Sequence, residues 1–206
     1  MAAGRVHGAR CEELAMRYEK GHKDATRQRI IEVASRQFRE QGVAAVGLAR
    51  IMSDAGLTNG AFYAHFDSKE DLFREVLSHG SFRNKLVKAA ENGTGLADAI
   101  RDYLSSAHRD NPGQGCPTSA LVAEIARHPR GTRKAFSGKL TDVIELIATG
   151  LDAGNEGERR RKAVAIYALM VGALQLARAV DDKRLSEEIL RSSACEALAL
   201  LGHTGS

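Results

Sequence analysis

The stretch that decides the fold is Thr26–Leu77, TRQRIIEVASRQFREQGVAAVGLARIMSDAGLTNGAFYAHFDSKEDLFREVL. Its apolar residues recur at three- and four-residue steps, which is the spacing of one buried helix face. Gly42 and Gly56 interrupt this pattern and predict the ends of two helices. A small polar and aromatic cluster remains that a core does not require: Thr58, Asn59, Gly60, Tyr63 and His65. We expect the function of the chain to lie in this cluster.

The periodicity predicts three short helices and a fourth that leads away from them, at Ala25–Gln41, Leu48–Ala55, Asn59–Phe66 and from Lys69 toward Ala90. Thr58 is expected to cap the third helix, and Ser68 with Asp71 is expected to form a capping box at the start of the fourth. Further helices are expected at Leu96–His108, Pro117–Arg127, Arg130–Leu151, Glu158–Val180 and Leu185–Leu201. Because no alternating strand pattern occurs, the sequence predicts an all-α protein.

Composition predicts a soluble, folded protein of the cytoplasm. The 206 residues are 43% hydrophobic and carry a formal net charge of +4, which permits a modest preference for polyanions. No apolar run reaches the length of about 18 residues that a membrane span needs, and residues 1–21 lack a signal-peptide core, so no membrane partner is expected. Three widely spaced cysteines, Cys11, Cys116 and Cys195, argue against a disulfide framework and against a thiolate metal site. We expect neither a metal nor a cofactor.

The segment from Leu48 to Phe66 has the element lengths of a helix-turn-helix, whose second helix lies in the major groove of DNA. Within it and just beyond, AGLTNGAFYAHFDSKEDLF (residues 55–73) resembles the TetR (TetR/AcrR) family of bacterial transcriptional regulators. A glycine turn, a short recognition helix ending in Tyr-x-His-Phe, and Ser-Lys-Glu follow in the order of that family. The resemblance is clear from Ala25 to Leu77, and the remaining chain matches the family in length and helicity only.

The resemblance implies an N-terminal three-helix helix-turn-helix DNA-binding domain at residues 23–70 and a C-terminal helical-bundle domain for ligand binding and dimerisation at 71–206. Residues 1–22 lack a sustained helical period and are expected to form a flexible basic arm or leader. Met16 offers an alternative translation start, so whether residues 1–15 belong to the protein stays open.

The resemblance also implies DNA contacts for Thr58, Asn59, Gly60, Ala61, Tyr63 and His65, and a phosphate contact for Lys69. Chemistry supports these roles, because an Asn amide pairs with adenine, Tyr and His donate to phosphates, and a lysine at a helix N-terminus attracts an anion. Arg27 and Arg50 are added as further contacts to the DNA backbone. Tyr63 and His65 have a second interpretation as core residues of the small domain. Gly47 and Asn59 depart from the hydroxyl cap and the lysine that are frequent in the family, which predicts fewer phosphate contacts and an unusual base preference.

By position, the middle helices resemble the part of the family that binds a small molecule, although their sequence does not identify it. Candidate ligand contacts are Leu86, Tyr103, Leu104, His108, Leu121, Ile125, Phe136 and Ile144, each with ordinary core as its alternative. The segment AVAIYALMVGALQLARAV (residues 163–180) is apolar on nearly every face and predicts a homodimer surface, with Gly172, Ala173 and Ala177 allowing close approach. A second stripe of Leu190, Ala194, Ala197, Leu198 and Leu201 is assigned to the same surface, with an intramolecular core as the alternative.

The sequence therefore predicts a homodimeric repressor that binds a near-palindromic double-stranded DNA operator and is released by an unknown small-molecule inducer. It predicts no enzyme, since the histidines are scattered and neither a Glu-x-x-His pair nor a phosphate-binding glycine loop occurs. A helical-bundle enzyme and an all-α interaction module without DNA binding stay open as alternatives. Cys116 is either a sensor of electrophiles or oxidants or a small apolar residue near a helix cap.

Overall fold

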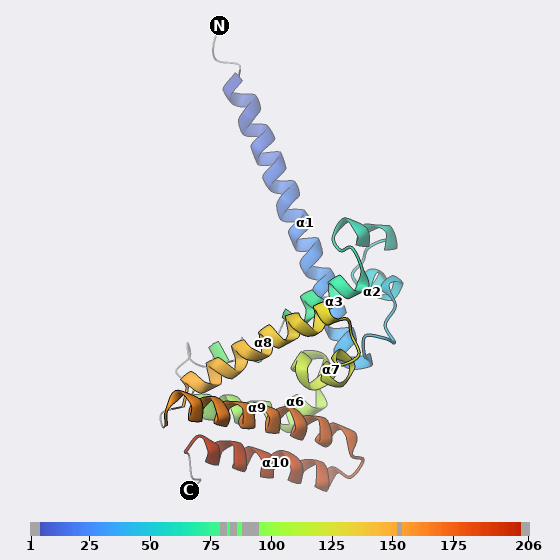
Figure 1. Cartoon of the computed structure of the whole chain (residues 1–206). Helices are drawn as coiled ribbons and strands as arrows, with labels where there is room; N and C mark the ends of the chain where they lie inside the picture. Colours follow the sequence, from blue (N-terminus) through green and yellow to red (C-terminus); the bar gives the residue numbers. More distant parts are fainter. Residues whose placement is uncertain (1–4, 79–81, 83–85, 88–94, 152–153, 203–206) are drawn as a thin grey trace.

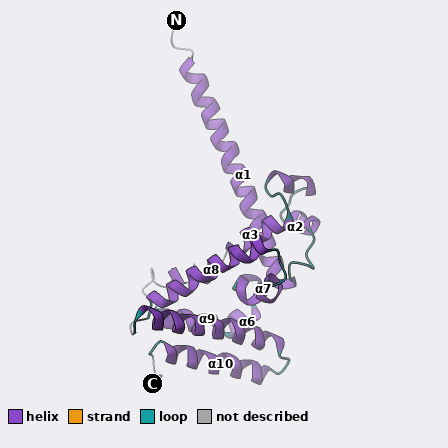
Figure 2. Ribbon diagram, viewed as in Figure 1, coloured by secondary structure: helices purple, strands orange, loops and turns teal. Residues whose placement is uncertain are grey.

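The computed structural model describes residues 5–78, 82, 86–87, 95–151 and 154–202, with side chains described from residue 23 onward. Every regular element among these residues is a helix, which confirms the all-α prediction (Figures 1 and 2). In chain order the elements are α1 (Arg5–Gln41), α2 (Leu48–Asp54), the 3-10 helix η1 (Asn59–Ala64), α3 (Lys69–Ser78), α5 (Leu96–Tyr103), α6 (Ser106–Asp110), the 3-10 helix η2 (Pro112–Gln114), α7 (Pro117–Ile125), α8 (Arg130–Thr149), α9 (Glu156–Ala179) and α10 (Lys183–Leu200).

The first helix starts far earlier than the sequence pattern indicates. We expected a helix from Ala25 and an arm at residues 1–22 without helical structure, but α1 begins at Arg5 and its first half projects away from the other helices (Figure 1). The segment contains no proline and many residues with high helix propensity, such as Ala, Arg, Glu and Lys. A helix of this kind needs no apolar face, and therefore leaves no hydrophobic period to detect.

The second half of α1 packs with α2, η1 and α3 around a core of aromatic side chains. Phe38 and Phe73 meet edge to face with ring centroids 5.8 Å apart, while Phe62 and Phe66 stack at 5.5 Å. All four rings are buried, as are most of the apolar residues that the periodicity assigned to α1 and α2, among them Ile30 and Ile51, whereas Val33 and Leu48 are half-buried. This core fixes the orientation of the short η1 segment relative to the other helices of the domain.

Two local details of this region differ from expectation. The third helix is a 3-10 helix that ends at Ala64, because so short a segment completes few of the i to i+4 bonds of an α-helix. Thr58 occupies its N-cap position but makes no side-chain cap bond. At the next helix Ser68 Oγ accepts from the Asp71 N–H at 3.1 Å as predicted, whereas Asp71 Oδ2 accepts from Asp67 at 3.4 Å instead of from Ser68.

The expected helix at Leu96–His108 is two helices, α5 and α6. Ser105 separates them with an extended backbone, and its hydroxyl accepts from the His108 N–H at 3.2 Å, so the serine starts a new helix instead of continuing the old one. The later helices lie where they were expected, with ends shifted by a few residues. The predicted helix from Lys69 toward Ala90 is observed as α3 up to Ser78, and most of the remainder lies outside the described residues.

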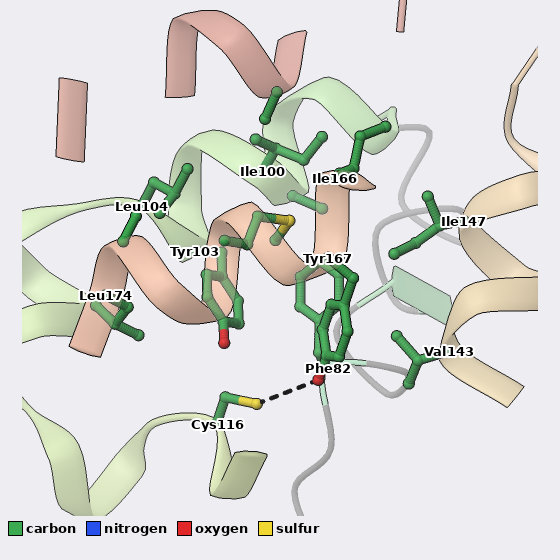
Figure 3. Close-up of a cluster of buried hydrophobic side chains, with 14 of the residues drawn as sticks. Phe82, Ile100, Tyr103, Leu104, Cys116, Val143, Ile147, Ile166, Tyr167 and Leu174 are labelled. Carbon is green, nitrogen blue, oxygen red and sulfur yellow. Dashed lines mark hydrogen bonds between the residues drawn. The ribbon is translucent and has the colours of Figure 1, made fainter. Parts of the chain in front are cut away.

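A second core lies around α9, which packs against α8 on one side and α10 on the other (Figure 1). Its centre is aromatic: Phe82 stacks on Tyr167 at 5.9 Å and meets Tyr103 edge to face at 5.0 Å (Figure 3). Among the described helices α9 alone is long and apolar enough to cross a membrane, and 44% of its apolar window is buried in the protein. Its buried residues, such as Met170 and Leu174, belong to this core, which accounts for its apolar character.

Candidate functional site

The η1 segment has one side exposed to solvent, while its opposite side is buried against the rest of the domain. Phe62 and Phe66 are fully enclosed, whereas Tyr63 between them is 69% exposed and lies edge-on to Phe62. Asn59 and Gly60 are exposed as well, and a Cβ added at Gly60 would meet no atom within 4 Å. Thr58 is also exposed and Ala61 half-buried. The structure thus brings the predicted base-reading residues onto one short segment with open space in front of it.

The structure places Tyr63 and His65, which each had two interpretations, in different surroundings. The exposure of Tyr63 excludes a core role for it. His65 is half-buried, and its Nδ1 is buried without a hydrogen-bond partner among the described residues. Burial lowers the pKa of the His65 imidazole, and the nearby charges of Lys23 and Arg27 lower this pKa further. His65 is therefore uncharged at neutral pH and offers hydrogen bonding to DNA without a positive charge.

The residues predicted to contact phosphate form bonds to other groups of the protein. Arg27 forms an ion pair with Glu75 at 3.1 Å and lies 4.7 Å from the centroid of the Phe66 ring. Arg50 donates to Gln41 Oε1 at 2.9 Å. Lys69 donates from Nζ to the Val43 carbonyl, and burial lowers the pKa of its ammonium group. Each of these cations retains further N–H groups, so an additional contact to phosphate is chemically possible.

The sequence did not identify Glu124, although it holds the turn between α1 and α2. From α7, its Oε2 accepts from the Val43 N–H at 2.9 Å and its Oε1 from the Ala44 N–H at 2.8 Å. The turn starts at Gly42, whose φ of 83° favours glycine. Since Lys69 bonds the Val43 carbonyl, the turn is held both from α3 and from α7. No sequence signal links residues so far apart in the chain.

Two more contacts join the helix-turn-helix region to the second half of the chain. Glu70 on α3 accepts from His128 Nδ1 at 2.9 Å and from the Thr132 hydroxyl. Burial on its own raises the pKa of Glu70, but the hydrogen bonds from Thr132 and His128 outweigh it and leave the pKa below its usual value. Arg39 on α1 donates to the Gly113 carbonyl of η2. The DNA-binding region is therefore tied to α7, α8 and η2 by polar contacts.

The predicted ligand residues do not gather at one place. Leu86, Tyr103, Leu104 and Ile144 lie in the second core, but Leu121 and Ile125 belong to the N-terminal core, against which Phe136 also packs. The reason is that α7 packs on α1 and α3 and places its apolar face there. His108 is taken up by internal bonds, since Nδ1 bonds the Tyr103 carbonyl at 2.7 Å and Nε2 accepts from the Cys116 N–H at 3.0 Å.

A cavity of about 650 Å³ lies between the end of α3, the start of α7, α8 and α9. Of the predicted ligand residues, Phe136 lines it. The other lining residues are Leu77, Ser78, Pro117, Thr118, Lys139, Leu140, Asp142, Val143, Glu145, Leu146, Thr149 and Tyr167. Cys116 adjoins this region but is buried, with Sγ 3.8 Å from the Tyr167 hydroxyl oxygen (Figure 3). The cavity combines apolar walls with both signs of charge, which suits a small amphipathic molecule.

The expected dimer surface is corrected in part. Leu190, Ala197, Ala173 and Ala177 are buried within the second core, because α9 and α10 pack against each other. What these helices leave exposed is a different set of large apolar side chains: Val164 is 44% exposed, Leu176 59% and Leu185 44%. Gly172 lies on open surface, since a Cβ there would meet no atom within 4 Å.

Comparison with known proteins agrees with this arrangement. The sequence model described as "Bacterial regulatory proteins, tetR family" matches residues 30–76. The HTH-type transcriptional repressor NemR of Escherichia coli is 26% identical over 162 residues, which cover 72% of this chain and 81% of NemR. The HTH-type transcriptional regulator AcrR of Shigella flexneri is 47% identical over 60 residues, which cover 29% of this chain and 28% of AcrR.

Solved structures extend the likeness beyond the N-terminal region. A TetR-family transcriptional regulator from Cytophaga hutchinsonii superposes with a TM-score of 0.71 at 20% identity, covering 88% of this chain and 95% of that one. The reduced form of E. coli NemR superposes with a TM-score of 0.69 at 24% identity, covering 84% of this chain and 95% of that one. The sequence of residues 30–76 matches the TetR family of bacterial regulatory proteins, and the chain as a whole shares the fold of solved TetR-family regulators.

Proposed function

We propose that the chain is a transcriptional repressor that binds a near-palindromic DNA operator as a homodimer and is released by a small-molecule inducer. The observation that carries this proposal is the η1 segment, where Asn59, Gly60 and Tyr63 are exposed on a base fixed by Phe62 and Phe66. Such a rigid, protruding polar segment suits the major groove. The names of relatives such as NemR support repression, and a cytoplasmic, non-enzymatic role follows from the same assignment.

Dimerisation is part of the proposal because one short recognition segment reads only a few base pairs. The exposed apolar side chains Val164, Leu176 and Leu185 on α9 and α10 supply a surface that a second copy would cover. Large apolar groups exposed on two helices that pack together, as α9 and α10 do, are typical of protein interfaces. Two copies related by a twofold axis would present two η1 segments to the two halves of a palindrome.

Release by an inducer follows from the contacts between the two regions. An inducer in the 650 Å³ cavity would touch α7 at Pro117 and Thr118, and α8 at Phe136. The same helices and the loop between them hold the DNA-binding region, through Glu124 on α7, His128 in the loop and Thr132 on α8. A small displacement of α7 or α8 would thus be passed to the α1–α2 turn and to α3. Such coupling between sites is typically worth about 1 to 3 kcal/mol.

The test of the proposal is binding to the DNA upstream of the chain's own gene, measured by fluorescence anisotropy across a salt series. We expect binding that resists excess random DNA and weakens steeply with salt, since phosphate neutralisation releases counterions. Equal affinity for random and upstream DNA, or no binding to either, would instead favour an interaction module that does not act on DNA.

Lys69→Ala is expected to weaken binding to operator and random DNA alike and to reduce the salt slope by about 0.9 for the lost phosphate contact. The reason is that a lysine reads charge and not sequence. Lys134→Ala is the matched control, because it removes the same charge from an exposed position on α8. A Lys69→Ala protein with an unchanged slope would show that this ammonium serves the Val43 carbonyl alone.

Tyr103→Phe is expected to stabilise the protein by up to about 1 kcal/mol, since it removes a buried hydroxyl whose interactions with Cys116 and Ser119 fall short of ordinary hydrogen-bond geometry. Urea unfolding measures the change. Tyr167→Phe is the control, because its hydroxyl contacts Cys116 Sγ at 3.8 Å and its removal brings no such gain. A destabilised Tyr103→Phe protein would show that the Tyr103 hydroxyl has an acceptor in the folded state.

A further inference from the structure

A polar groove of about 680 Å³ lies between α1, the end of α6, η2, α7, the end of α9 and the start of α10. It is separate from the proposed inducer cavity and shares no lining residue with it. Four cations line it: Arg39, Arg109, Arg178 and Lys183. The remaining lining residues are Glu40, Asp110, Pro112, Ser119, Ala120, Gln175, Ala177, Val180, Asp181 and Ser186.

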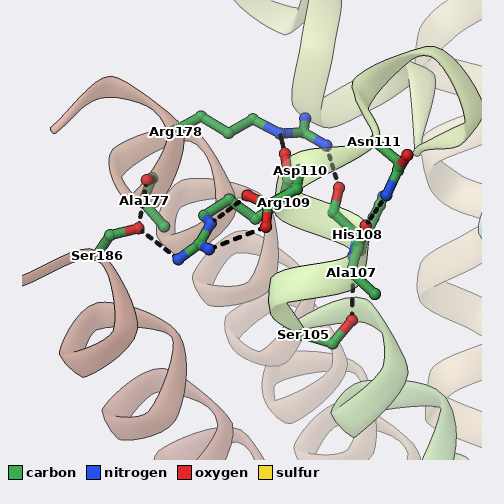
Figure 4. Close-up of polar contacts among 9 residues, drawn as sticks. All are labelled: Ser105, Ala107, His108, Arg109, Asp110, Asn111, Ala177, Arg178 and Ser186. Carbon is green, nitrogen blue, oxygen red and sulfur yellow. Dashed lines mark hydrogen bonds and ion pairs between the residues drawn. The ribbon is translucent and has the colours of Figure 1, made fainter. Parts of the chain in front are cut away.

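Arg39 and Arg178 make hydrogen bonds to uncharged acceptors. Arg39 donates to the Gly113 carbonyl and to the Ser35 hydroxyl. Arg178 donates to the Arg109 carbonyl at 3.1 Å, to the His108 carbonyl at 2.7 Å and to Ser119 Oγ at 3.3 Å (Figure 4). Within the described part of the chain, no carboxylate lies within ion-pairing distance of either guanidinium.

Partial burial without an ion-pair partner is energetically unfavourable for the guanidinium groups of Arg39 and Arg178. Burial lowers the pKa of the Arg39 guanidinium and that of Arg178, and neighbouring groups offset this effect only in part. A cation withdrawn from water is stabilised fully only by a counter-charge. Each guanidinium has five N–H groups in a planar fork, and the bonds described here leave N–H groups on both residues for a further acceptor.

The carboxylates of the groove supply only part of that counter-charge, through the attraction of Glu40 to Arg39 and of Asp110 to Arg178. Asp110 is held by Arg109, which donates from Nε at 2.7 Å and from Nη2 at 3.1 Å (Figure 4). Glu40 lies against η2, where its Oε1 would be 2.2 Å from a Cβ added at Gly113. Asp181 is exposed at the rim, as is Lys183. The groove therefore combines two partly buried guanidiniums, which have no ion-pair partner among the described residues, with the exposed cation Lys183 at its edge.

We propose that this groove is a second ligand site, which binds a small anion carrying phosphate or carboxylate groups. Arg39 and Arg178 bind its oxygens from the floor through their forked N–H groups, the geometry that arginine uses for both classes of anion. Lys183 adds charge at the rim. Because Arg39 belongs to α1 and Arg178 to α9, a bound anion links α1 to the second core. The site stands whether or not the chain represses transcription.

Titration calorimetry on the full-length protein tests the site with two probes, inorganic phosphate and succinate, at constant ionic strength maintained with chloride. We expect saturable binding of at least one probe, and the stronger one identifies phosphate or carboxylate as the preferred chemistry. Arg178→Lys keeps the charge but loses the fork, and Lys183→Glu reverses a rim charge, so each should weaken binding by about tenfold or more.

Lys134→Glu is the matched control, since it makes the same charge reversal on an exposed residue of α8 and should leave the affinity unchanged. Lys183 is exposed and, among the described residues, has a charge attraction to Asp110 but no described hydrogen bond or ion pair, so Lys183→Glu is expected to fold even if Arg178→Lys does not. The proposal is overturned if neither probe binds, or if Lys183→Glu and Lys134→Glu bind both probes as tightly as the native chain.

Discussion

Phe62→Ala is expected to lower the free energy of unfolding by about 3 to 5 kcal/mol and to abolish DNA binding, because it removes the ring that anchors η1. Phe62 is fully buried and contacts two rings, Phe66 at 5.5 Å and Tyr63 at 5.3 Å between centroids. Its loss leaves a cavity beneath the recognition segment, which then has no fixed orientation.

Tyr63→Ala is the matched variant, one residue away on the same element. Tyr63 is 69% exposed, so its removal should change stability by no more than about 0.5 kcal/mol while still weakening DNA binding. Thermal unfolding and operator titration of both variants separate the two roles. If the two variants lost the same stability, the division of η1 into a buried base and a DNA-facing surface would be wrong.

Glu124→Ala is expected to cost about 2 to 3 kcal/mol of stability, since it leaves the Val43 and Ala44 N–H groups without their carboxylate acceptor. The loss should be concentrated in the α1–α2 turn. Hydrogen exchange of the Val43 and Ala44 amides would report it directly, and operator affinity should fall because α2 is no longer held in place relative to η1.

Glu124→Gln is the control for that prediction, because the amide retains one oxygen that can accept from one of the two N–H groups. Its stability should fall between those of the native protein and Glu124→Ala. Faster exchange of both amides in Glu124→Ala, with one protected in Glu124→Gln, is the expected pattern. Unchanged protection in both variants would show that the turn holds its shape without α7.

Sequence patterns predicted the helices well wherever one helix face is buried. Ile30, Phe38 and Ile51 recur at helical steps because they fill one core, and each of them is buried in the structure. The first half of α1 escaped prediction because its sequence has no apolar period. The break at Ser105 escaped as well, since a serine that caps a helix and a serine within one look alike until the His108 N–H is placed.

Some residues of the candidate sites could likewise be found from the sequence, and others could not. The cluster from Thr58 to His65 could be found from sequence because its residues are neighbours in the chain and its polar character is not explained by a core. The ligand residues could not, since amphipathic helices show that Leu121 and Ile125 are buried but not which of two cores buries them. The stripe of Leu190 and Ala197 failed for the same reason: a buried face and a dimer face have the same period.

By itself the sequence determined the all-α class, the helix-turn-helix and the position of its exposed polar cluster, because these depend on local periodicity and on a short motif. Only the tertiary structure decided how the two regions are joined. Glu124 on the α1–α2 turn, Glu70 with His128, and Arg39 with Arg178 around one groove are pairings across large sequence separations. Such contacts form only when the cores bring their helices together, and no local pattern records them.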